Sequence, residues 1–440
     1  MTTAGPDRAP VPGAFGSAPG AFGSAPGAFA SAARDAGGPE ILLDVADLTV
    51  GFATEDGIVQ AVRGVSYQLR RGDSLGIVGE SGSGKSVTSL AIMGLLPKTA
   101  RIAGSVRFSG EELLHRSDDS MSQVRGNKIA MIFQDPLTSL NPVYTIGFQI
   151  IETVQAHNDV SKAEARNRAI ELLGVVGIPH PNQRVDSYPH ELSGGMRQRV
   201  VIAIAMANNP DVIIADEPTT ALDVTVQAQV LEALEAARAE TGAALVLITH
   251  DLGVIAGHAE RICVMYAGKL VEKGSVEDVF YRPRMPYTLG LLGSLPRLDR
   301  AGHGRLTPIL GSPPSLVNLP PGCPFTPRCP MAQPVCDEQE PGLYVTDGPE
   351  HRAACHFHGQ LVGLSSDQLF RPTSVDAVLP EDLEVAGPGA ATAVPAAAPA
   401  APPAAPEAAP AASAAAPAAS AAAPAAAPAA PAAAPNEEAL

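Results

Sequence analysis

The sequence lacks several features that would assign it to a common class of protein. Basic residues are not in excess, because 30 Lys and Arg stand against 46 Asp and Glu and give a formal net charge of −16. A basic surface for nucleic acid or anionic lipid is therefore not expected. No apolar run reaches the about eighteen residues of a membrane-spanning helix. The first residues offer no export signal and there are only five cysteines, so we expect a cytosolic protein without structural disulfides.

Both ends of the chain have a low-complexity composition. Residues 13–33 repeat "GAFGSAP GAFGSAP GAFASAA", and residues 387–435 are nearly all Ala and Pro. A proline every few residues breaks the helix that alanine alone would favour. We expect disorder in these ends, which would serve either as tethers or as passive solvated tails.

The middle of the chain alternates apolar strands with helical segments. Strands are expected in "ILLDVADLTVGF", "AVRGVSYQLRRGDSLGIVG", "DVIIADEP" and "AALVLITHD", and a helix in "TVQAQVLEALEAARAE". This order indicates an α/β fold whose parallel sheet is covered on both faces. The functional groups are then expected at the carboxyl ends of the strands.

One of these strand ends carries a phosphate-binding pattern. Residues 79–86 read "GESGSGKS", which fits G-x4-G-K-[ST] and lies between an expected strand and an expected helix. The glycines let successive N–H groups surround a phosphate, Lys85 can reach the β- and γ-phosphates, and the Ser86 hydroxyl can bind Mg²⁺. The strand–helix context favours nucleotide binding over a chance match.

The residues at other strand ends have both a functional and a structural interpretation when each is considered alone. Asp216 and Glu217 end an apolar strand, where they could hold Mg²⁺ and polarise water or merely cap a loop. His250 in "LITHD" and Gln134 in "IFQDP" each have a purely structural alternative. In "ELSGGMRQRVVIAIAMA" a serine and two glycines precede an expected helix, which makes a second anion site.

Together and in this order, the motifs resemble the ATP-binding subunit of ABC transporters over roughly residues 40–350. The resemblance implies an α/β P-loop NTPase (ABC ATPase) core with a mixed sheet, an inserted helical subdomain and a small Cys-containing C-terminal extension between disordered termini. The expected boundaries are 1–38 for the N-terminal repeat, 39–298 for the ATPase domain with its helical subdomain at about 136–209, 299–360 for the extension and 361–440 for the tail.

The resemblance also implies roles for individual residues. Glu217 corresponds to the catalytic base, His250 to the switch histidine, Gln134 to the Q-loop, and Phe52 to the aromatic residue that stacks on adenine. The implied nucleotide-binding residues are Phe52, Gly79, Glu80, Ser81, Gly82, Ser83, Gly84, Lys85, Ser86, Val87, Ser193, Gly194, Gly195 and Asp223. The implied Mg²⁺ ligands are Ser86, Gln134 and Asp216.

In the resembled family two ATPase subunits face each other head to tail and hold each ATP between them. The signature sequence at residues 192–196 would then serve the partner's γ-phosphate, with Ser193, Gly194 and Gly195 as donors. Here Met196 stands where the family usually has Gln, and Phe52 replaces the commoner Tyr. Loss of the γ-phosphate on hydrolysis would open this two-state clamp. The surface around Gln134 is the expected contact with the membrane subunits.

Several phrases are similar to the dipeptide/oligopeptide importer group, including "QDPLTSLNPVYTIGFQI", "PYTLGLLGSLPR" and "PGCPFTPRCPMAQPVC". The chain resembles the first ATPase of the pair, which implies a paralogous ATPase, two permeases and an extracellular binding protein as partners, at the cytoplasmic face of the membrane. Nickel, glutathione and oligosaccharides are alternative cargoes. A non-transport ABC ATPase is disfavoured by the single cassette, and a purely regulatory module by the presence of Glu217 and His250.

Four cysteines of the extension have the spacing C-x5-C-x6-C-x18-C; they are Cys323, Cys329, Cys336 and Cys355. Clustered thiols in a reducing compartment suggest either Zn²⁺ or an iron–sulfur cluster, and the spacing matches no common zinc pattern. The resemblance favours a [4Fe–4S] cluster, because similar extensions carry one. His351 and His356 are alternative ligands, and Cys263 is expected in the core.

Overall fold

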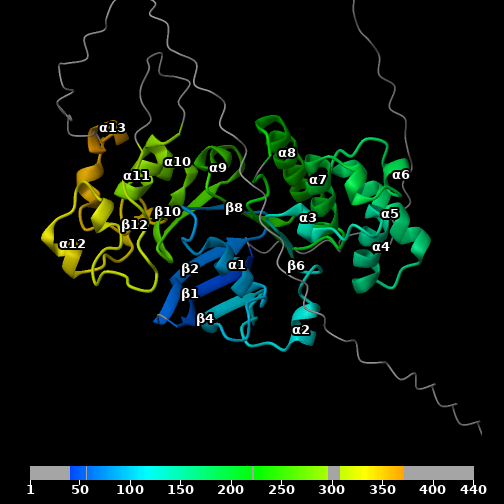
Figure 1. Cartoon of the computed structure of the whole chain (residues 1–440), viewed down its shortest axis with the longest axis horizontal. Helices are drawn as coiled ribbons and strands as arrows, with labels where there is room; N and C mark the ends of the chain where they lie inside the picture. The colour runs from blue at the N-terminus through cyan, green and yellow to red at the C-terminus, as the bar shows by residue number, and fades with distance from the viewer. Residues whose placement is uncertain (1–39, 56, 221, 296–307, 371–440) are drawn as a thin grey trace, which may run out of the picture. The chain divides into compact units, whose positions relative to one another are not determined.

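The computed structural model describes residues 40–55, 57–220, 222–295 and 308–370. The two low-complexity ends, for which disorder is expected, lie outside the described residues. The described chain forms two sheets and the helices that cover them (Figure 1). Among these residues no helix combines the length and the apolar character that crossing a membrane requires.

The first strands form a small antiparallel sheet of their own. Its order is β2 (Gly57–Arg70), β1 (Ile41–Thr54), β4 (Arg101–Phe108) and β5 (Glu111–Glu112). The alternating apolar residues expected as strands in this region bury one face, because Leu43, Val45 and Leu69 are fully or almost fully buried. This face packs toward the larger sheet.

The second sheet is mixed, as the resemblance implied. Its order is β11 (Tyr344–Val345), β12 (Arg352–Ala353), β10 (Lys269–Ser275), β9 (Arg261–Tyr266), β3 (Ser74–Val78), β8 (Ala244–Thr249), β7 (Val212–Asp216) and β6 (Ile129–Ile132). The five strands from β9 to β6 are parallel, whereas β10, β12 and β11 add to the edge in antiparallel pairs.

Both faces of the large sheet are buried, because successive side chains of a strand point to opposite sides. In β8, Val246 and Ile248 join the core shared with the small sheet and α1 (Lys85–Ile92). Leu245 and Leu247 join the other core, which contains most of the helices. The parallel sheet covered on both faces, expected from the apolar strands, is thereby confirmed.

The remaining helices fall into three groups along the chain. After the short α2 (Asp118–Ser122), a helical group comprises α3 (Pro136–Ser139), α4 (Ile146–His157), α5 (Lys162–Val175), α6 (Pro181–Arg184), η1 (Pro189–Glu191) and α7 (Gly194–Ala205). Next come α8 (Val224–Thr241), α9 (Leu252–His258), α10 (Val276–Tyr281) and α11 (Pro286–Gly293). The C-terminal segment 308–370 holds η2 (Thr326–Arg328), α12 (Pro334–Glu338), η3 (His358–Leu361) and α13 (Ser366–Leu369).

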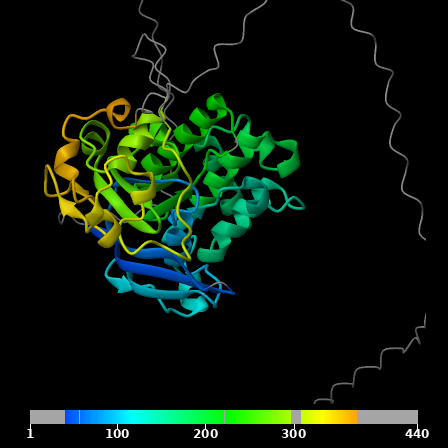
Figure 2. The ribbon, with the colours of Figure 1, turned by 60° about the vertical axis from the view of Figure 1, so that its left-hand side comes forward.

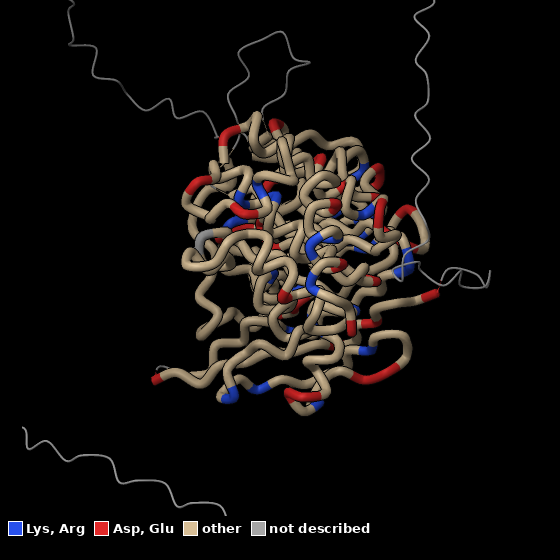
Figure 3. Tube along the Cα trace, turned by 90° about the vertical axis from the view of Figure 1, so that its right-hand side faces the viewer, with Lys and Arg blue, Asp and Glu red and all other residues tan. Residues whose placement is uncertain are grey.

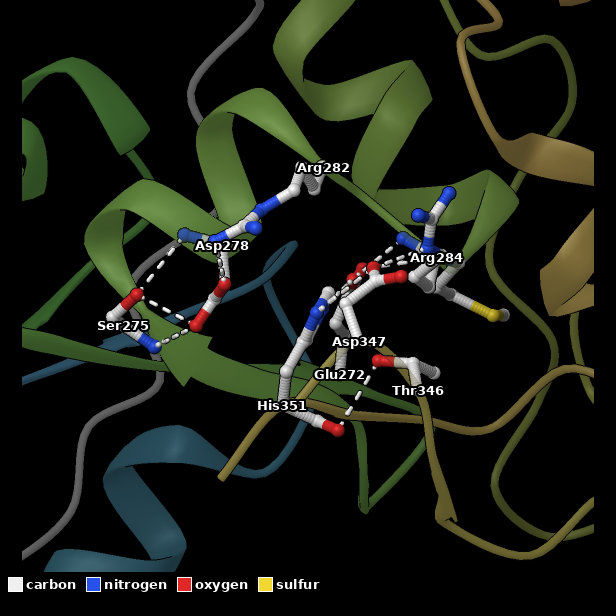
Figure 4. A network of polar contacts seen from close by, with 9 residues as sticks. Glu272, Ser275, Asp278, Arg282, Arg284, Thr346, Asp347 and His351 are labelled. Atoms are coloured by element: carbon white, nitrogen blue, oxygen red, sulfur yellow. Dashed lines mark hydrogen bonds and ion pairs between the residues drawn. The ribbon is translucent and has the colours of Figure 1, made fainter. Parts of the chain in front are cut away.

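The C-terminal segment lies beside α10 and α11, far from α4, α5 and α6, in both Figure 1 and Figure 2. A buried polar network attaches it to β10 (Figure 4). The imidazole of His351 lies 2.9 Å from the Glu272 carboxylate, and neither side chain has any exposed surface. Arg284 donates its main-chain N–H to Glu272 at 2.6 Å and its side-chain Nε to Asp347 at 2.6 Å. Such buried contacts fix the register of the segment on the sheet.

Candidate functional site

Four parallel strands bring their carboxyl ends to one edge of the large sheet. Val78 lies beside Thr249, Ile248 beside Asp216, and Ala215 beside Ile132 in the paired registers of β3, β8, β7 and β6. Each strand is followed by residues expected in the site, namely Gly79, His250, Glu217 and Gln134. The pairing therefore collects motifs that are up to 171 residues apart, from position 79 to position 250.

The glycine-rich loop between β3 and α1 requires glycine at two positions for steric reasons. Gly79 has φ +157° and Gly84 has φ +100°. A Cβ on Gly79 would lie 2.3 Å from the Met265 carbonyl oxygen, and one on Gly84 would lie 2.4 Å from the Ala61 carbonyl oxygen. At these two positions the loop runs against neighbouring backbone with no room for a side chain. Helix α1 begins without a side-chain cap on its N–H groups. Uncapped N–H groups beside a glycine-rich turn form an anion site.

Lys85 lies inside the loop. Its ammonium donates to the carbonyl oxygens of Gly79 at 2.8 Å and Glu80 at 3.1 Å. Burial lowers the pKa of Lys85, and the carboxylates of Glu217 and Asp216 oppose that shift. An amine held this way is a cation without strong ion pairing, since the nearest Glu217 oxygen is 3.9 Å away.

Asp216 and Ser86 place two oxygen donors next to each other. The Ser86 hydroxyl donates to Asp216 Oδ1 at 3.0 Å, and Asp216 is buried at the end of β7. Burial raises the pKa of Asp216, and the Ser86 hydrogen bond only partly opposes it. A buried carboxylate beside a hydroxyl suits a hard divalent cation, which would relieve the unfavourable burial of charge.

Glu217 adopts a backbone conformation that is unusual for a residue with a side chain. Its φ is +47°, and its N–H is held by the Ile248 carbonyl at 2.9 Å. This conformation costs about 1–3 kcal/mol and is typical of functional sites. Glu217 Oε2 accepts hydrogen bonds from Gln134 Nε2 at 3.2 Å and from the Thr220 hydroxyl at 2.9 Å, and His250 Nδ1 lies 3.4 Å from the same oxygen.

Lys85, Ser86, Gln134, Glu217 and His250 line one open cavity of about 630 Å³. Its lining consists of Gly79, Glu80, Ser81, Gly82, Ser83, Gly84, Lys85, Ser86, Val87, Gln134, Glu217, His250 and Leu291. The cavity combines N–H donors, a buried ammonium, the Ser86 hydroxyl that contacts Asp216, and a carboxylate held by three side chains. This arrangement suits a polyphosphate with an attacking water.

Comparison with known proteins gives the family. The family model described as "ABC transporter" matches residues 62–220, and the one described as "Oligopeptide/dipeptide transporter, C-terminal region" matches residues 271–336. The dipeptide transport ATP-binding protein DppD of Bacillus subtilis is 52% identical over 73% of this chain and 96% of its own length. The chain belongs to the ATP-binding proteins of oligopeptide and dipeptide ABC transporters.

Two further known proteins are similar to this chain, over different fractions of their own lengths. The oligopeptide transport ATP-binding protein OppD of Mycobacterium bovis is 55% identical over 75% of this chain, but the match spans only 54% of the mycobacterial protein. A dimeric ATP-binding cassette solved with ADP and phosphate bound is 30% identical, with a TM-score of 0.48 over 53% of this chain and 99% of that one.

Six residues expected at the ATP site of this ABC ATPase do not line the cavity, and one of them, Asp216, contacts it only through Ser86. Phe52 is partly buried in β1 and packs against the core beneath the small sheet. Ser193 and Gly194 are exposed at the start of α7, whereas Gly195 is buried against Val226 of α8. Asp223 caps α8 by accepting from two main-chain N–H groups.

The structure also adds residues that sequence reasoning missed. Tyr287 of α11 accepts a hydrogen bond from the Glu80 N–H at 2.9 Å, and Leu291 of the same helix lines the cavity. Arg328 of the C-terminal segment binds the Glu80 carboxylate. These contacts join residues more than 200 positions apart in the sequence, so no local pattern could have indicated them.

The four cysteines of the C-terminal segment line one small cavity. Burial raises the pKa of Cys329 to about 12 and that of Cys355 to about 11, and neighbouring thiol groups add to both shifts. Within the described ranges, no group of three or more His, Cys, Asp or Glu side chains could hold a metal ion. Cys263 lies outside this cavity and is buried in β9, as expected.

Acidic and basic residues are interspersed along the described chain, as Figure 3 shows. The sheet edge that bears the cavity holds Lys85 together with Asp216 and Glu217. Among the described residues that line the cavity, Lys85 is the one Lys or Arg side chain.

Gly84→Ala is expected to lower the free energy of unfolding by about 3 kcal/mol or more, since backbone blocks the new Cβ. Gly82→Ala is the matched control, because Gly82 also has a positive φ of +77° but has no atom within 4 Å of the added Cβ. The control should lose only about 1–2 kcal/mol. Urea denaturation of the nucleotide-free proteins measures both, and equal losses would contradict the steric account.

Asp216→Asn is expected to stabilise the nucleotide-free protein at pH 7. The pKa of Asp216 is raised by burial above its ordinary value of 3.8. A raised folded-state pKa gives stability that is fully present below the unfolded value and is lost as the pH rises through the folded value. The advantage of the Asp216→Asn variant should therefore grow from about pH 4 upward.

Thermal denaturation in EDTA across a pH series tests this expectation. The exposed Asp159→Asn change is the control and should follow the wild-type pH dependence. A gain from Asp216→Asn that is constant with pH would show that ionisation is not its cause.

Proposed function

We propose that this chain is the ATP-hydrolysing subunit of an ABC importer for dipeptides or oligopeptides. The observation that carries the proposal is the position of Glu217 in the cavity. Its carboxylate is held by Gln134, Thr220 and His250 next to a loop built for phosphates. A base and a phosphate site that share one cavity are the minimum that NTP hydrolysis requires.

The cavity suggests how ATP would bind. The N–H groups of the glycine-rich loop and the start of α1 would surround the phosphates, and Lys85 would exchange its carbonyl partners for phosphate oxygens. Ser86, Asp216 and Gln134 would hold Mg²⁺, which supplies positive charge to the phosphates when bound. Phe52 would stack on adenine, a contact typically worth about 1–3 kcal/mol.

Glu217 would orient the attacking water and accept its proton. Its strained backbone directs the carboxylate into the cavity, and the Thr220 hydroxyl and the Gln134 amide fix its rotamer. His250 is largely exposed, with 61% of its side-chain surface accessible, so it is free to contact a γ-phosphate. Charge stabilisation and positioning would then supply most of the rate increase.

The signature sequence supports a nucleotide sandwich between two subunits. Ser193 and Gly194 lie outside the cavity and are exposed at the start of a twelve-residue helix. Ser193 accepts from the Met196 N–H at 3.3 Å, and the N–H groups of Gly194 and Gly195 have no partner within the helix because they belong to its first turn. We propose that they bind the ATP of a paralogous subunit, since they do not line this chain's own cavity.

The proposed contact with the permeases lies near Gln134. Four apolar side chains of this region are exposed, namely Phe133, Val143, Tyr144 and Phe148. The rings of Tyr144 and Phe148 stack with centroids 4.6 Å apart. Exposed aromatic side chains next to each other typically mark a protein interface. This surface would hold the chain at the cytoplasmic face of the membrane, with the permeases and an extracellular binding protein completing the importer.

Glu217→Gln is expected to reduce ATP turnover by at least about 100-fold, because the amide cannot accept a proton. ATP binding should persist, so the variant should accumulate as a nucleotide-loaded dimer with its paralogue. Phosphate release and size-exclusion chromatography with ATP measure the two effects. Glu232→Gln, an exposed change on α8, is the matched control. Near-normal turnover in the Glu217→Gln variant would refute the assignment of the base.

We further propose that the four cysteines bind a [4Fe–4S] cluster rather than a single zinc ion. One tetrahedral Zn²⁺ with Zn–S bonds of about 2.3 Å would need mutually close sulfurs. The thiols converge on one cavity, and neighbouring thiols raise the pKa of Cys329 and Cys355, yet the four form no group suited to one ion. A cluster binds each thiolate at a different iron, which allows wider spacing. Its positive irons would also overcome the raised pKa values.

Anaerobic purification tests the cluster. A brown protein with broad absorbance at about 400 nm and four irons per chain is expected. Replacement of Cys336 by Ser should abolish the colour, whereas replacement of Cys263 should leave it unchanged. A colourless protein that contains zinc would refute the proposal.

A further inference from the structure

The C-terminal segment reaches the phosphate loop through one ion pair. Arg328 Nη1 and Nη2 donate to the two Glu80 carboxylate oxygens at 2.7 and 2.9 Å, across 248 positions of sequence. The Arg328 side chain is only 4% exposed and that of Glu80 27% exposed. A two-pronged Arg–carboxylate pair with little solvent access is strong and geometrically specific.

Arg328 has little freedom to move away from this contact. Its Nε donates to the Leu310 carbonyl at 3.1 Å, and Nη1 also donates to the Tyr266 hydroxyl at 3.3 Å. The guanidinium lies 5.9 Å from the ring centroids of both Tyr266 and Phe325. These rings belong to an aromatic group with Tyr287, whose members have centroids 4.6 to 5.5 Å apart. The cation is therefore held in position before any nucleotide binds.

Glu80 is the residue through which this restraint would act on the loop. Its N–H donates to the Tyr287 hydroxyl at 2.9 Å. Its carbonyl oxygen accepts from Lys85 Nζ at 3.1 Å and from the Ser83 N–H at 3.2 Å. Glu80, which binds Arg328 through its carboxylate, thus also stabilises the turn around the Lys85 ammonium through its carbonyl oxygen. Fixing Glu80 fixes the shape of the phosphate site.

Arg328 also belongs to the cysteine-lined part of the chain. It ends η2, the single turn between Cys323 and Cys329. The Thr326 N–H donates to the Cys323 carbonyl at 3.0 Å, and the Cys329 N–H donates to the Thr326 carbonyl at 3.2 Å. The Cys336 carbonyl accepts from both the Cys323 N–H and the Thr326 hydroxyl. The backbone that carries Arg328 and the backbone that lines the cysteine cavity therefore belong to the same hydrogen-bonded turn.

We propose that Arg328 is a positioning residue for ATP binding, and that through it the order of the cysteine-lined turn sets the affinity of the phosphate loop. The inference rests on the proposed function, because it concerns ATP at residues 79–86. The contact preorganises the loop, so its loss should weaken ATP binding while leaving the catalytic groups in place. Disorder in the turn would release Arg328 and have the same effect on affinity.

The first experiment is a double-mutant cycle with Arg328→Met and Glu80→Gln, which keep side-chain length. The dissociation constant is measured by calorimetry with the non-hydrolysable analogue AMP-PNP and Mg²⁺. Each single change should weaken binding about tenfold, and the double variant should be no weaker than the singles. The kcat of the Arg328→Met variant at saturating ATP should stay within about twofold of wild type. Arg352→Met, an exposed change in the same segment, is the control.

Several outcomes separate the explanations. Arg328→Lys should recover only part of the affinity, because an ammonium cannot make the two-pronged contact. Additive effects of the two changes, or a lowered melting temperature with unchanged affinity in the folded protein, would overturn the proposal and leave a structural role. Failure of the wild-type chain to bind AMP-PNP would instead refute the proposed function.

The second experiment tests the coupling to the cysteines. Cys336→Ser should weaken AMP-PNP binding about fivefold in the wild-type background and by less than about twofold in the Arg328→Met background, since the link is already broken there. Cys263→Ser is the control from outside the cavity. An unchanged affinity in the wild-type background, or equal effects in both backgrounds, would overturn the coupling.

Discussion

Parallel hydrogen bonding between β3, β8, β7 and β6 holds the whole nucleotide site together. Parallel neighbours end at the same edge, so the residues that follow each strand meet whatever their distance in sequence. The apolar side chains of these strands bury both faces of the sheet. That burial stabilises a scaffold rigid enough to hold Glu217 in an unfavourable backbone conformation.

The site contains buried charged groups whose burial is unfavourable and which a ligand of opposite charge would stabilise. Burial lowers the pKa of Lys85 and raises that of Asp216, so each charged form is disfavoured by its surroundings. Polyphosphate and a divalent cation bring the complementary charges. The desolvation that disfavours the charged forms of Lys85 and Asp216 in the empty site would therefore favour ligand binding. The free energy of folding keeps these two side chains in place.

The C-terminal segment is attached to this scaffold at two places of different character. Strand β12 extends the sheet beside β10, and the buried contact of His351 with Glu272 fixes it there. Arg328 reaches back to Glu80 in the phosphate loop. Under the proposal made above for Arg328, the order of this segment would affect the affinity of the phosphate loop through the Arg328–Glu80 contact.

The sequence alone determined the features that depend on neighbours along the chain. The apolar strands, the loop at residues 79–86 and the helix starting after Ser193 follow from local periodicity and glycine placement, and the structure confirms these elements. Because strand ends converge in an α/β sheet, the meeting of Glu217 with His250 was also predictable. Only the tertiary structure revealed the contacts of Arg328 and Tyr287 with the loop and the placement of the cysteines around one cavity. Their partners come from irregular segments, whose paths depend on long-range packing that no local sequence pattern records.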